Sequence, residues 1–247
     1  LRPMFTTEEI WCQLFSEPGS GSDLASLSTK AVDDGDGYIV NGQKVWTTLG
    51  HLAKWGLIVT RTDPNVPKHR GLTFFIVDME SDGVDVRPLR QITGEAEFNE
   101  VYFTDVKIPK ENILGSLGEG WRVSLTILMN ERVAIGGNVR ERGSGAPGHL
   151  VQLWKEKNLQ DPVTRDKLIK LWIEQEAVRL TNMRAVENRE KGTPGPEGST
   201  SKLYEAEINK ASYEFGMDML GNDGLLFPRG YALTQPELNF ENETFGF

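Results

Sequence analysis

The hydrophobic period changes once along the chain, near residues 109–120, and this change constrains the fold more than any other feature. Before it, short apolar runs alternate with turn signals roughly every 8–12 residues, a spacing typical of a β-sandwich or β-barrel. After Pro109 and the glycine-rich residues 115–120, apolar residues recur at helical spacing. We therefore expect a β domain followed by a helical domain.

The β part should hold about eight strands between residues 11 and 103, a number set by its apolar runs. The acidic, glycine-containing residues 33–37 predict a hairpin, because Asp-Gly accommodates a positive φ. Asn41-Gly42 predicts a second turn, ahead of a strand over residues 43–47. Cys12 lies in the first apolar run, which favours a buried core cysteine over a nucleophile.

Three helices are expected in the second part. The first begins near Trp121 and runs for about five turns, judged from its apolar spacing. The second begins at Asp161-Pro162, with Asp161 as the N-cap and Pro162 at the first helical position. It ends in the glycine- and proline-containing residues 192–198, and a third helix follows over about 200–220.

Composition excludes several classes of function. The net charge of −9 opposes nucleic-acid binding, which needs a basic surface. Three histidines and one cysteine are too few and too scattered for a zinc or copper site, so we expect no metal. No apolar run approaches the ~20 residues that a membrane span needs. The single cysteine fits a reducing compartment, most simply the cytosol.

Two segments carry chemical information. Residues 15–23 read Phe-Ser-Glu-Pro-Gly-Ser-Gly-Ser-Asp, and residues 45–48 read Val-Trp-Thr-Thr. Glycines permit close backbone approach and hydroxyls supply hydrogen bonds, whereas the aromatic side chain offers a flat face. The first segment is also compatible with an ordinary tight turn, and Trp46 with core packing. Together the two segments indicate a bound flavin.

Five motifs, in order, resemble the acyl-CoA dehydrogenase family. Residues 15–23 are similar to its T-E-P-x-A/G-G-S-D flavin loop, and residues 38–48 to its N-G-x-K-x-W-I-T hallmark. Three further matches are Arg-Thr-Asp-Pro at 61–64, the segment 101–109, and Gly-Glu-Gly-Trp at 118–121. The resemblance spans residues 11–224.

The resemblance implies an α+β multidomain fold, with a middle β-barrel domain followed by a C-terminal helical bundle. Residues 1–10 would be a remnant of an N-terminal helical domain or linker. Residues 11–117 would form the middle domain, which binds flavin and acyl-CoA. Residues 118–247 would form an incomplete C-terminal domain. Because position 1 is not Met and no closing element ends the chain, we expect it to be part of a longer protein.

The resemblance also implies FAD as cofactor. Ser16 stands where the family usually has Thr and keeps the hydroxyl. Trp46 would pack against the ring system and Thr48 would hydrogen-bond near N5. The segment containing Gly221 would approach the adenosine, although a plain helix C-cap explains this glycine equally well. The implied cofactor contacts are Phe15, Ser16, Gly21, Ser22, Trp46, Thr47, Thr48, Gly221 and Asn222.

The reaction also needs a proton acceptor, for which the sequence offers one candidate and two alternatives. The pattern x-E-R, found in isovaleryl- and long-chain-type members of the family, matches Glu131-Arg132 and makes Glu131 the candidate base. The alternatives are a structural ion pair at Glu131 and a base beyond residue 247. Arg132 and Ser22 would contact the thioester ligand. The basic residues 68–70 would either meet a CoA phosphate or form a solvated loop, and Arg165 is a weak candidate for the FAD pyrophosphate.

The function implied is FAD-dependent α,β-dehydrogenation of an acyl-CoA to the enoyl-CoA, with the hydride passing to flavin N5 and the α-proton to a glutamate. An electron-transfer flavoprotein would take the electrons, and a homo-oligomer, dimer or tetramer, is expected. The alternatives are an acyl-CoA oxidase, a flavin monooxygenase, or a non-catalytic acyl-CoA- or flavin-binding homologue. The sequence does not specify the acyl group, and activity is expected of the full-length protein rather than of this chain alone.

Overall fold

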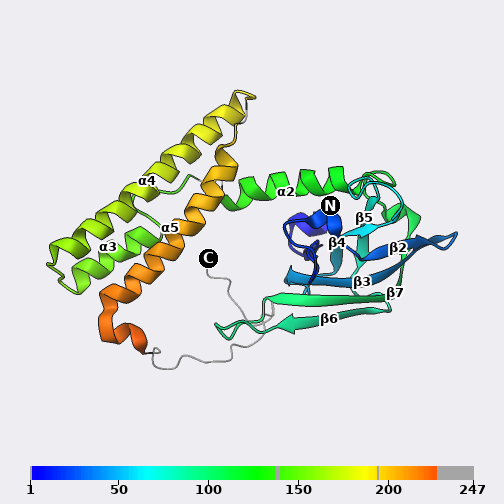
Figure 1. Ribbon diagram of the computed structural model, residues 1–247, viewed down its shortest axis with the longest axis horizontal. Coiled ribbons are helices and arrows are strands. Elements are labelled where there is room, and N and C mark those ends of the chain that lie inside the picture. The colour runs from blue at the N-terminus through cyan, green and yellow to red at the C-terminus, as the bar shows by residue number, and fades with distance from the viewer. Residues whose placement is uncertain (1, 137–138, 194, 227–247) are drawn as a thin grey trace. The chain divides into compact units, whose positions relative to one another are not determined.

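The computed structural model describes residues 2–136, 139–193 and 195–226, and for residues 132–136 only the backbone (Figure 1). Two compact units follow one another, the first ending at Thr126 and the second beginning at Ile127. The first is a β unit and the second is helical, so the predicted fold class is confirmed. The two units are described separately below.

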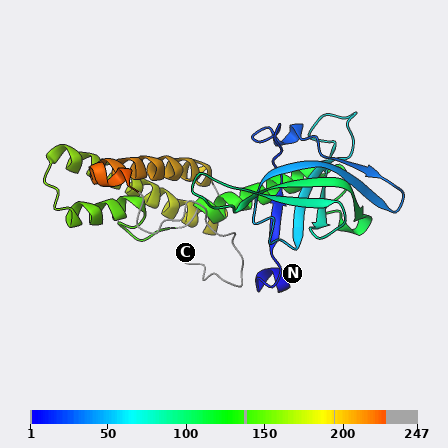
Figure 2. The ribbon, with the colours of Figure 1, turned by 90° about the horizontal axis from the view of Figure 1, so that it is seen from below.

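The β unit is built on one seven-stranded sheet in the order β1-β4-β2-β3-β7-β6, with β5 paired to β4. The predicted hairpin is confirmed as β2 and β3, which pair antiparallel with Asp33 opposite Tyr38. The two longest strands, β3 and β7, lie side by side in both views (Figures 1 and 2). The strands are β1 (Trp11–Leu14), β2 (Lys30–Asp33), β3 (Gly37–Thr48), β4 (Trp55–Arg61), β5 (Leu72–Asp78), β6 (Val84–Leu89) and β7 (Phe98–Pro109).

The predicted turn at Asn41-Gly42 is wrong, because both residues lie inside the continuous strand β3. The pairing of β3 with β7 shifts register between Val40 and Gly42 instead. A Cβ on Gly42 would lie 2.7 Å from the Cβ of Thr29, so the glycine serves a close approach of two chain segments. Glycine is a sequence signal both for a tight turn and for a β-bulge, so the sequence did not distinguish the two at this position.

Buried side chains that alternate along the strands form the core of the β unit. Strand alternation explains them, since every second residue of a half-buried strand faces inward. Each such aliphatic or aromatic side chain stabilises the fold by about 1.5–3 kcal/mol. The core includes Leu14, Val40, Ile58, Phe75, Val101 and Val106. Cys12 is buried among them, as predicted, and its burial raises the pKa of the thiol to about 12.

The helical part contains one helix that the sequence did not predict, α3, which begins directly after Gly145 at φ +82°. Its glycine-rich start obscures the helical period. The N-cap of the long helix is confirmed, because the Asp161 carboxylate accepts a hydrogen bond from Thr164 N–H at 2.7 Å. The helices are α1 (Arg2–Phe5), α2 (Gly120–Gly136), α3 (Ala146–Glu156), α4 (Pro162–Glu190) and α5 (Glu197–Leu220), with short 3₁₀ turns η1 (Leu24–Ser26), η2 (Lys110–Asn112) and η3 (Gly221–Leu225).

Gly120 seats the start of α2 on strand β5. A Cβ at this position would lie 2.7 Å from Thr73 N and 2.8 Å from Leu72 C, which are backbone atoms that have little freedom to move. We expect Gly120→Ala to lower the free energy of unfolding by roughly 1–3 kcal/mol, despite the better helix propensity of Ala. Chemical denaturation measures this, with Gly19→Ala as control, because a Cβ at Gly19 has no atom within 4 Å. An unchanged midpoint for Gly120→Ala would contradict this packing.

Candidate functional site

Residues 15–23 form a loop closed by its own hydrogen bonds. Glu17 N–H donates to Ser20 O at 2.8 Å and Ser20 N–H donates back to Glu17 O at 3.0 Å, so Pro18-Gly19 form the tip of a tight turn. The Ser20 hydroxyl donates to Asp23 O at 2.8 Å and is used internally. Gly21 and Ser22, in contrast, are exposed to solvent.

The chain itself does not need the glycines of this loop. Neither Gly19 nor Gly21 has a left-handed φ, and a Cβ built on either would have no neighbour within 4 Å. A glycine that satisfies no requirement of its own chain fits a position where an external group approaches the backbone closely. The loop is thus a suitable cradle for a flat ligand.

A buried ion pair that sequence reasoning missed holds this loop. The Lys44 ammonium lies 2.9 Å from Glu17 Oε1, and the two side chains are 0% and 4% exposed. Lys44 Nζ also donates to Phe15 O at 3.0 Å. Glu17 accepts three more hydrogen bonds, from Ser28 N–H, the Ser28 hydroxyl and Thr29 N–H, at 2.7, 2.7 and 2.9 Å.

These contacts perturb both groups of the pair. Burial alone would raise the pKa of Glu17, but the Lys44 charge and the hydrogen bonds from Thr29 and Ser28 outweigh it and lower the pKa to about 2. Complete burial lowers the pKa of Lys44 to about 8, against the opposing effect of Glu17. Both groups are therefore charged at neutral pH.

Trp46 occupies a strained, outward-facing position on β3. Its φ is +61°, rare for a bulky residue, and it lies where the β3–β7 register shifts between Lys44 and Thr47. The bulge turns the indole outward, leaving Trp46 62% exposed, with its ring edge-on to Phe98 at 6.1 Å between ring centroids. Core packing, the alternative considered from sequence, does not describe this residue.

The residues around Trp46 divide between two faces. Thr48 is exposed like Trp46, whereas Thr47 is fully buried and its hydroxyl has no hydrogen-bond partner among the residues that the structure describes. Val45 N–H donates to Ser16 O at 2.9 Å, which ties the loop to β3 one residue before Trp46. The structure therefore brings Ser16 and Trp46 together. Phe15 is buried, its ring edge-on to Phe74 at 5.6 Å, so only its backbone faces the loop.

The basic residues 68–70 are all exposed to solvent, as the solvated-loop alternative expects, but their side chains have different partners. Lys68 Nζ binds both carboxylate oxygens of Asp23 at 2.7 Å, so it fastens this segment to the end of the loop. His69 packs edge-on against Trp121 at 4.7 Å, and Arg70 is exposed. Arg61 donates to the carbonyls of Ala25, Leu27 and Lys68, which fixes the same junction.

In the helical unit, the predicted base Glu131 is 27% exposed at its side chain and pairs with Lys202 of α5 at 3.1 Å. This contact corresponds to the structural ion pair that was the alternative to a catalytic role for Glu131. Gly221 caps α5 at φ +58°, and Asn222 is exposed in η3. Arg165 is exposed on the first turn of α4. The side chain of Arg132 lies outside the described residues.

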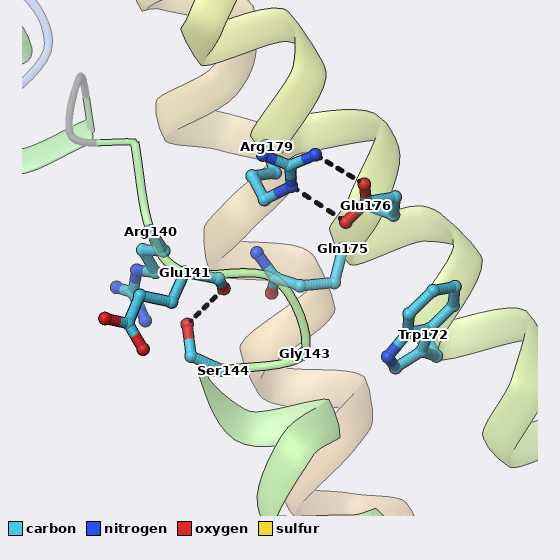
Figure 3. Close-up of a pocket in the computed structure, with 8 residues that line it drawn as sticks. All are labelled: Arg140, Glu141, Gly143, Ser144, Trp172, Gln175, Glu176 and Arg179. Carbon is cyan, nitrogen blue, oxygen red and sulfur yellow. Dashed lines mark hydrogen bonds and ion pairs between the residues drawn. The ribbon is translucent and has the colours of Figure 1, made fainter.

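A narrow cleft lies within the helical unit, between residues 140–144 and α4 (Figure 3). Arg179 binds Glu176 through two nitrogens at 2.7 and 2.9 Å, and the buried Gln175 side chain is drawn between this pair and the loop. The cleft encloses about 10 Å³, room for at most one water molecule. It is too small for a cofactor or an acyl group.

Within the described ranges, no helix is both long and apolar enough to cross a lipid bilayer. Over the same residues, no three histidine, cysteine, aspartate or glutamate side chains come together as ligands for a metal ion.

Comparison with known families identifies both units. Residues 12–106 match the family described as "Acyl-CoA dehydrogenase, middle domain", and residues 118–239 match "Acyl-CoA dehydrogenase, C-terminal domain". The chain belongs to the acyl-CoA dehydrogenase family, of which it carries the middle and C-terminal domains.

Individual relatives agree with this. The acyl-CoA dehydrogenase FadE34 of Mycobacterium tuberculosis is 42% identical over 225 residues, covering 89% of this chain and 30% of its own length. The solved steroid ACAD Tcur3481-Tcur3483 has a TM-score of 0.80 at 26% identity, covering 93% of this chain and 60% of its own. The ChsE4-ChsE5 complex of M. tuberculosis has a TM-score of 0.80 at 28% identity, covering 95% and 62%. The chain thus spans less than two thirds of each relative.

The Glu17 carboxylate predicts a specific loss of stability in acid. Its pKa is lower in the folded protein, about 2, than its ordinary value of 4.5, so its contribution is complete above pH 4.5 and disappears as the pH falls toward 2. The loss should be on the order of 3 kcal/mol. Urea denaturation at several pH values measures it. Glu17→Gln should remove this dependence, and an identical pH dependence in that variant would contradict the assignment.

Proposed function

We propose that the full-length protein carrying this chain is an FAD-dependent acyl-CoA dehydrogenase, which oxidises an acyl-CoA thioester to the enoyl-CoA. One observation carries the proposal beyond family membership. An open loop with two unconstrained glycines lies beside an exposed, strained indole, and the hydrogen bond from Val45 to Ser16 joins them. A flat cofactor that accepts hydrogen bonds at its edge fits such a surface.

The residues of the β unit suit a flavin. Ser16 is half-buried, Thr48 is exposed, and the indole of Trp46 presents a flat apolar face. FAD, when bound, supplies an acceptor for the hydride removed from the substrate. The chain's part is to orient the ring beside Trp46 and to donate hydrogen bonds where negative charge develops. Gly221 and Asn222 are proposed to meet the adenosine.

Glu131 is the proposed proton acceptor for the α-carbon of the substrate. A carboxylate positioned at the α-proton is the usual general base for a weakly acidic carbon acid. The Lys202 ammonium donates a hydrogen bond to the Glu131 carboxylate and so orients it. Ser22 and Arg132 are proposed to contact the thioester. The competing assignment is a glutamate in the part of the full-length protein that lies outside this chain.

Relatives and surface properties support the proposed substrate class and partners. Because one similar structure is a steroid ACAD, we propose an acyl-CoA from lipid or steroid metabolism. We further propose an electron-transfer flavoprotein as electron acceptor and assembly with a second copy. Exposed Ile173 and Leu180 on α4 and Met217 on α5 fit an assembling surface. The single buried thiol of Cys12 fits the reducing cytosol.

The open space at Gly21 provides a test of the cofactor. Gly21→Ala should leave the melting temperature of the cofactor-free protein unchanged and weaken FAD binding about tenfold, because the added methyl group occupies space that the flavin needs. Fluorescence titration with FAD measures this in the full-length protein. Gly198→Ala, also in open space, is the matched control and should bind FAD normally. Equal affinities for both variants would remove Gly21 from the cofactor site.

Glu131→Gln tests the base. In an anaerobic titration of the full-length protein with straight-chain and steroid-linked acyl-CoA thioesters, the wild type should lose its flavin absorbance. Glu131→Gln should slow this bleaching by about 10²–10⁴-fold. Glu207→Gln, at an exposed glutamate of α5, is the control. Near-normal bleaching in Glu131→Gln would assign the proton to another carboxylate. Rapid reoxidation of the reduced wild type by air would indicate an oxidase instead.

A further inference from the structure

We propose that Lys44 is a positioning residue of the flavin site, which fixes Ser16 relative to Trp46 by holding the Phe15 carbonyl and the Glu17 carboxylate inside the β unit. The proposal rests on the FAD-binding function proposed above and assigns a role within that site. Lys44 does not itself face the ligand, because its side chain is fully buried. It acts through the loop that it holds.

The two peptide groups on either side of Ser16 are both held by neighbouring residues of β3. Lys44 Nζ donates to Phe15 O at 3.0 Å, and Val45 N–H donates to Ser16 O at 2.9 Å. With both carbonyls fixed, the Ser16 residue between them has little freedom to rotate. The next residue of β3 is Trp46, so the same short segment of strand sets both predicted flavin contacts.

The ion pair also closes the base of the loop. Glu17 lies near the start of the loop of residues 15–23. Ser28 and Thr29, which follow this loop, donate three hydrogen bonds of 2.7 to 2.9 Å to the Glu17 carboxylate. The two ends of the segment 18–27 are therefore held together at the Glu17 carboxylate. Lys44 is the only cation on this carboxylate in the described part of the chain. The ion pair of Lys44 with Glu17 therefore connects β3 to both ends of the segment 18–27.

Stability alone does not require a lysine here. A buried ion pair is often replaceable by apolar residues of similar size without loss of stability, because both ions must be removed from water. A methionine at position 44 would fill the space but donate nothing to Phe15 O. Unlike methionine, lysine therefore fixes the position of the Phe15–Glu17 segment. A role in positioning and a role in stability therefore predict different results for a variant in which both charges are removed.

The test compares Lys44→Met, Glu17→Gln and the double variant in the full-length protein. The single variants each leave one buried charge without its partner and should melt at lower temperature. The double variant leaves neither buried charge unpaired, so it should melt at a higher temperature than Lys44→Met, but it should bind FAD about tenfold more weakly than the wild type. Its bound flavin should show an altered visible spectrum and a shifted reduction potential, since the Phe15 carbonyl has lost its donor. Lys110→Met, which removes the ion pair with Asp33, is the control and should change none of these.

A double variant with wild-type FAD affinity, spectrum and potential would overturn the proposal. A double variant that fails to fold would also overturn it, because the pair would then serve stability. If the wild type itself does not bind FAD, the proposed function fails, and this result is distinct from either of the others.

Discussion

Lys44 and Glu17 place opposite charges in the interior of the β unit, where neither is in contact with bulk water. Removing two ions from water costs several kcal/mol each, and their attraction offsets this only when the remaining hydrogen-bonding capacity is also used. Here Glu17 accepts three further hydrogen bonds and Lys44 donates one to Phe15 O. The loop, the residues after it and β3 therefore depend on one another, because a shift of any one would leave a buried charge poorly matched.

The same strand carries the strained residue of the site two positions later. The positive φ of this bulky residue costs on the order of 1–3 kcal/mol. The outward position of Trp46 also leaves a large apolar surface in solvent. Neither effect helps the isolated domain to fold. Both are understandable if a flat ligand covers the indole, since its burial would recover the hydrophobic contribution. The register shift against β7 and the buried Lys44 keep the strand in this conformation.

Local signals predicted the fold better than they predicted the connections within the site. The hairpin at residues 33–37 and the N-cap Asp161 follow from short-range chemistry, and both were confirmed. The Glu17–Lys44 pair joins residues far apart in sequence. Each residue belongs to one of the two matched motifs, but nothing in either motif shows that they pair with each other. The bulge at Gly42 was misread as a turn because glycine serves both. Family resemblance supplied the ligand chemistry, which the residues alone indicated only as a flat, hydrogen-bonding cofactor.

Among the glutamate–lysine pairs of the described residues, those of Glu17 and Glu131 have surroundings that suit different tasks. Glu17 is buried and accepts four hydrogen bonds, one from Lys44, and protonation would leave several of these donors without an acceptor. Glu131 is partly exposed and accepts one hydrogen bond among the described residues, from Lys202. Glu131 is therefore held by one partner and stays in contact with water, which suits the role of proton acceptor proposed above, whereas the enclosed carboxylate of Glu17 suits the holding of a loop.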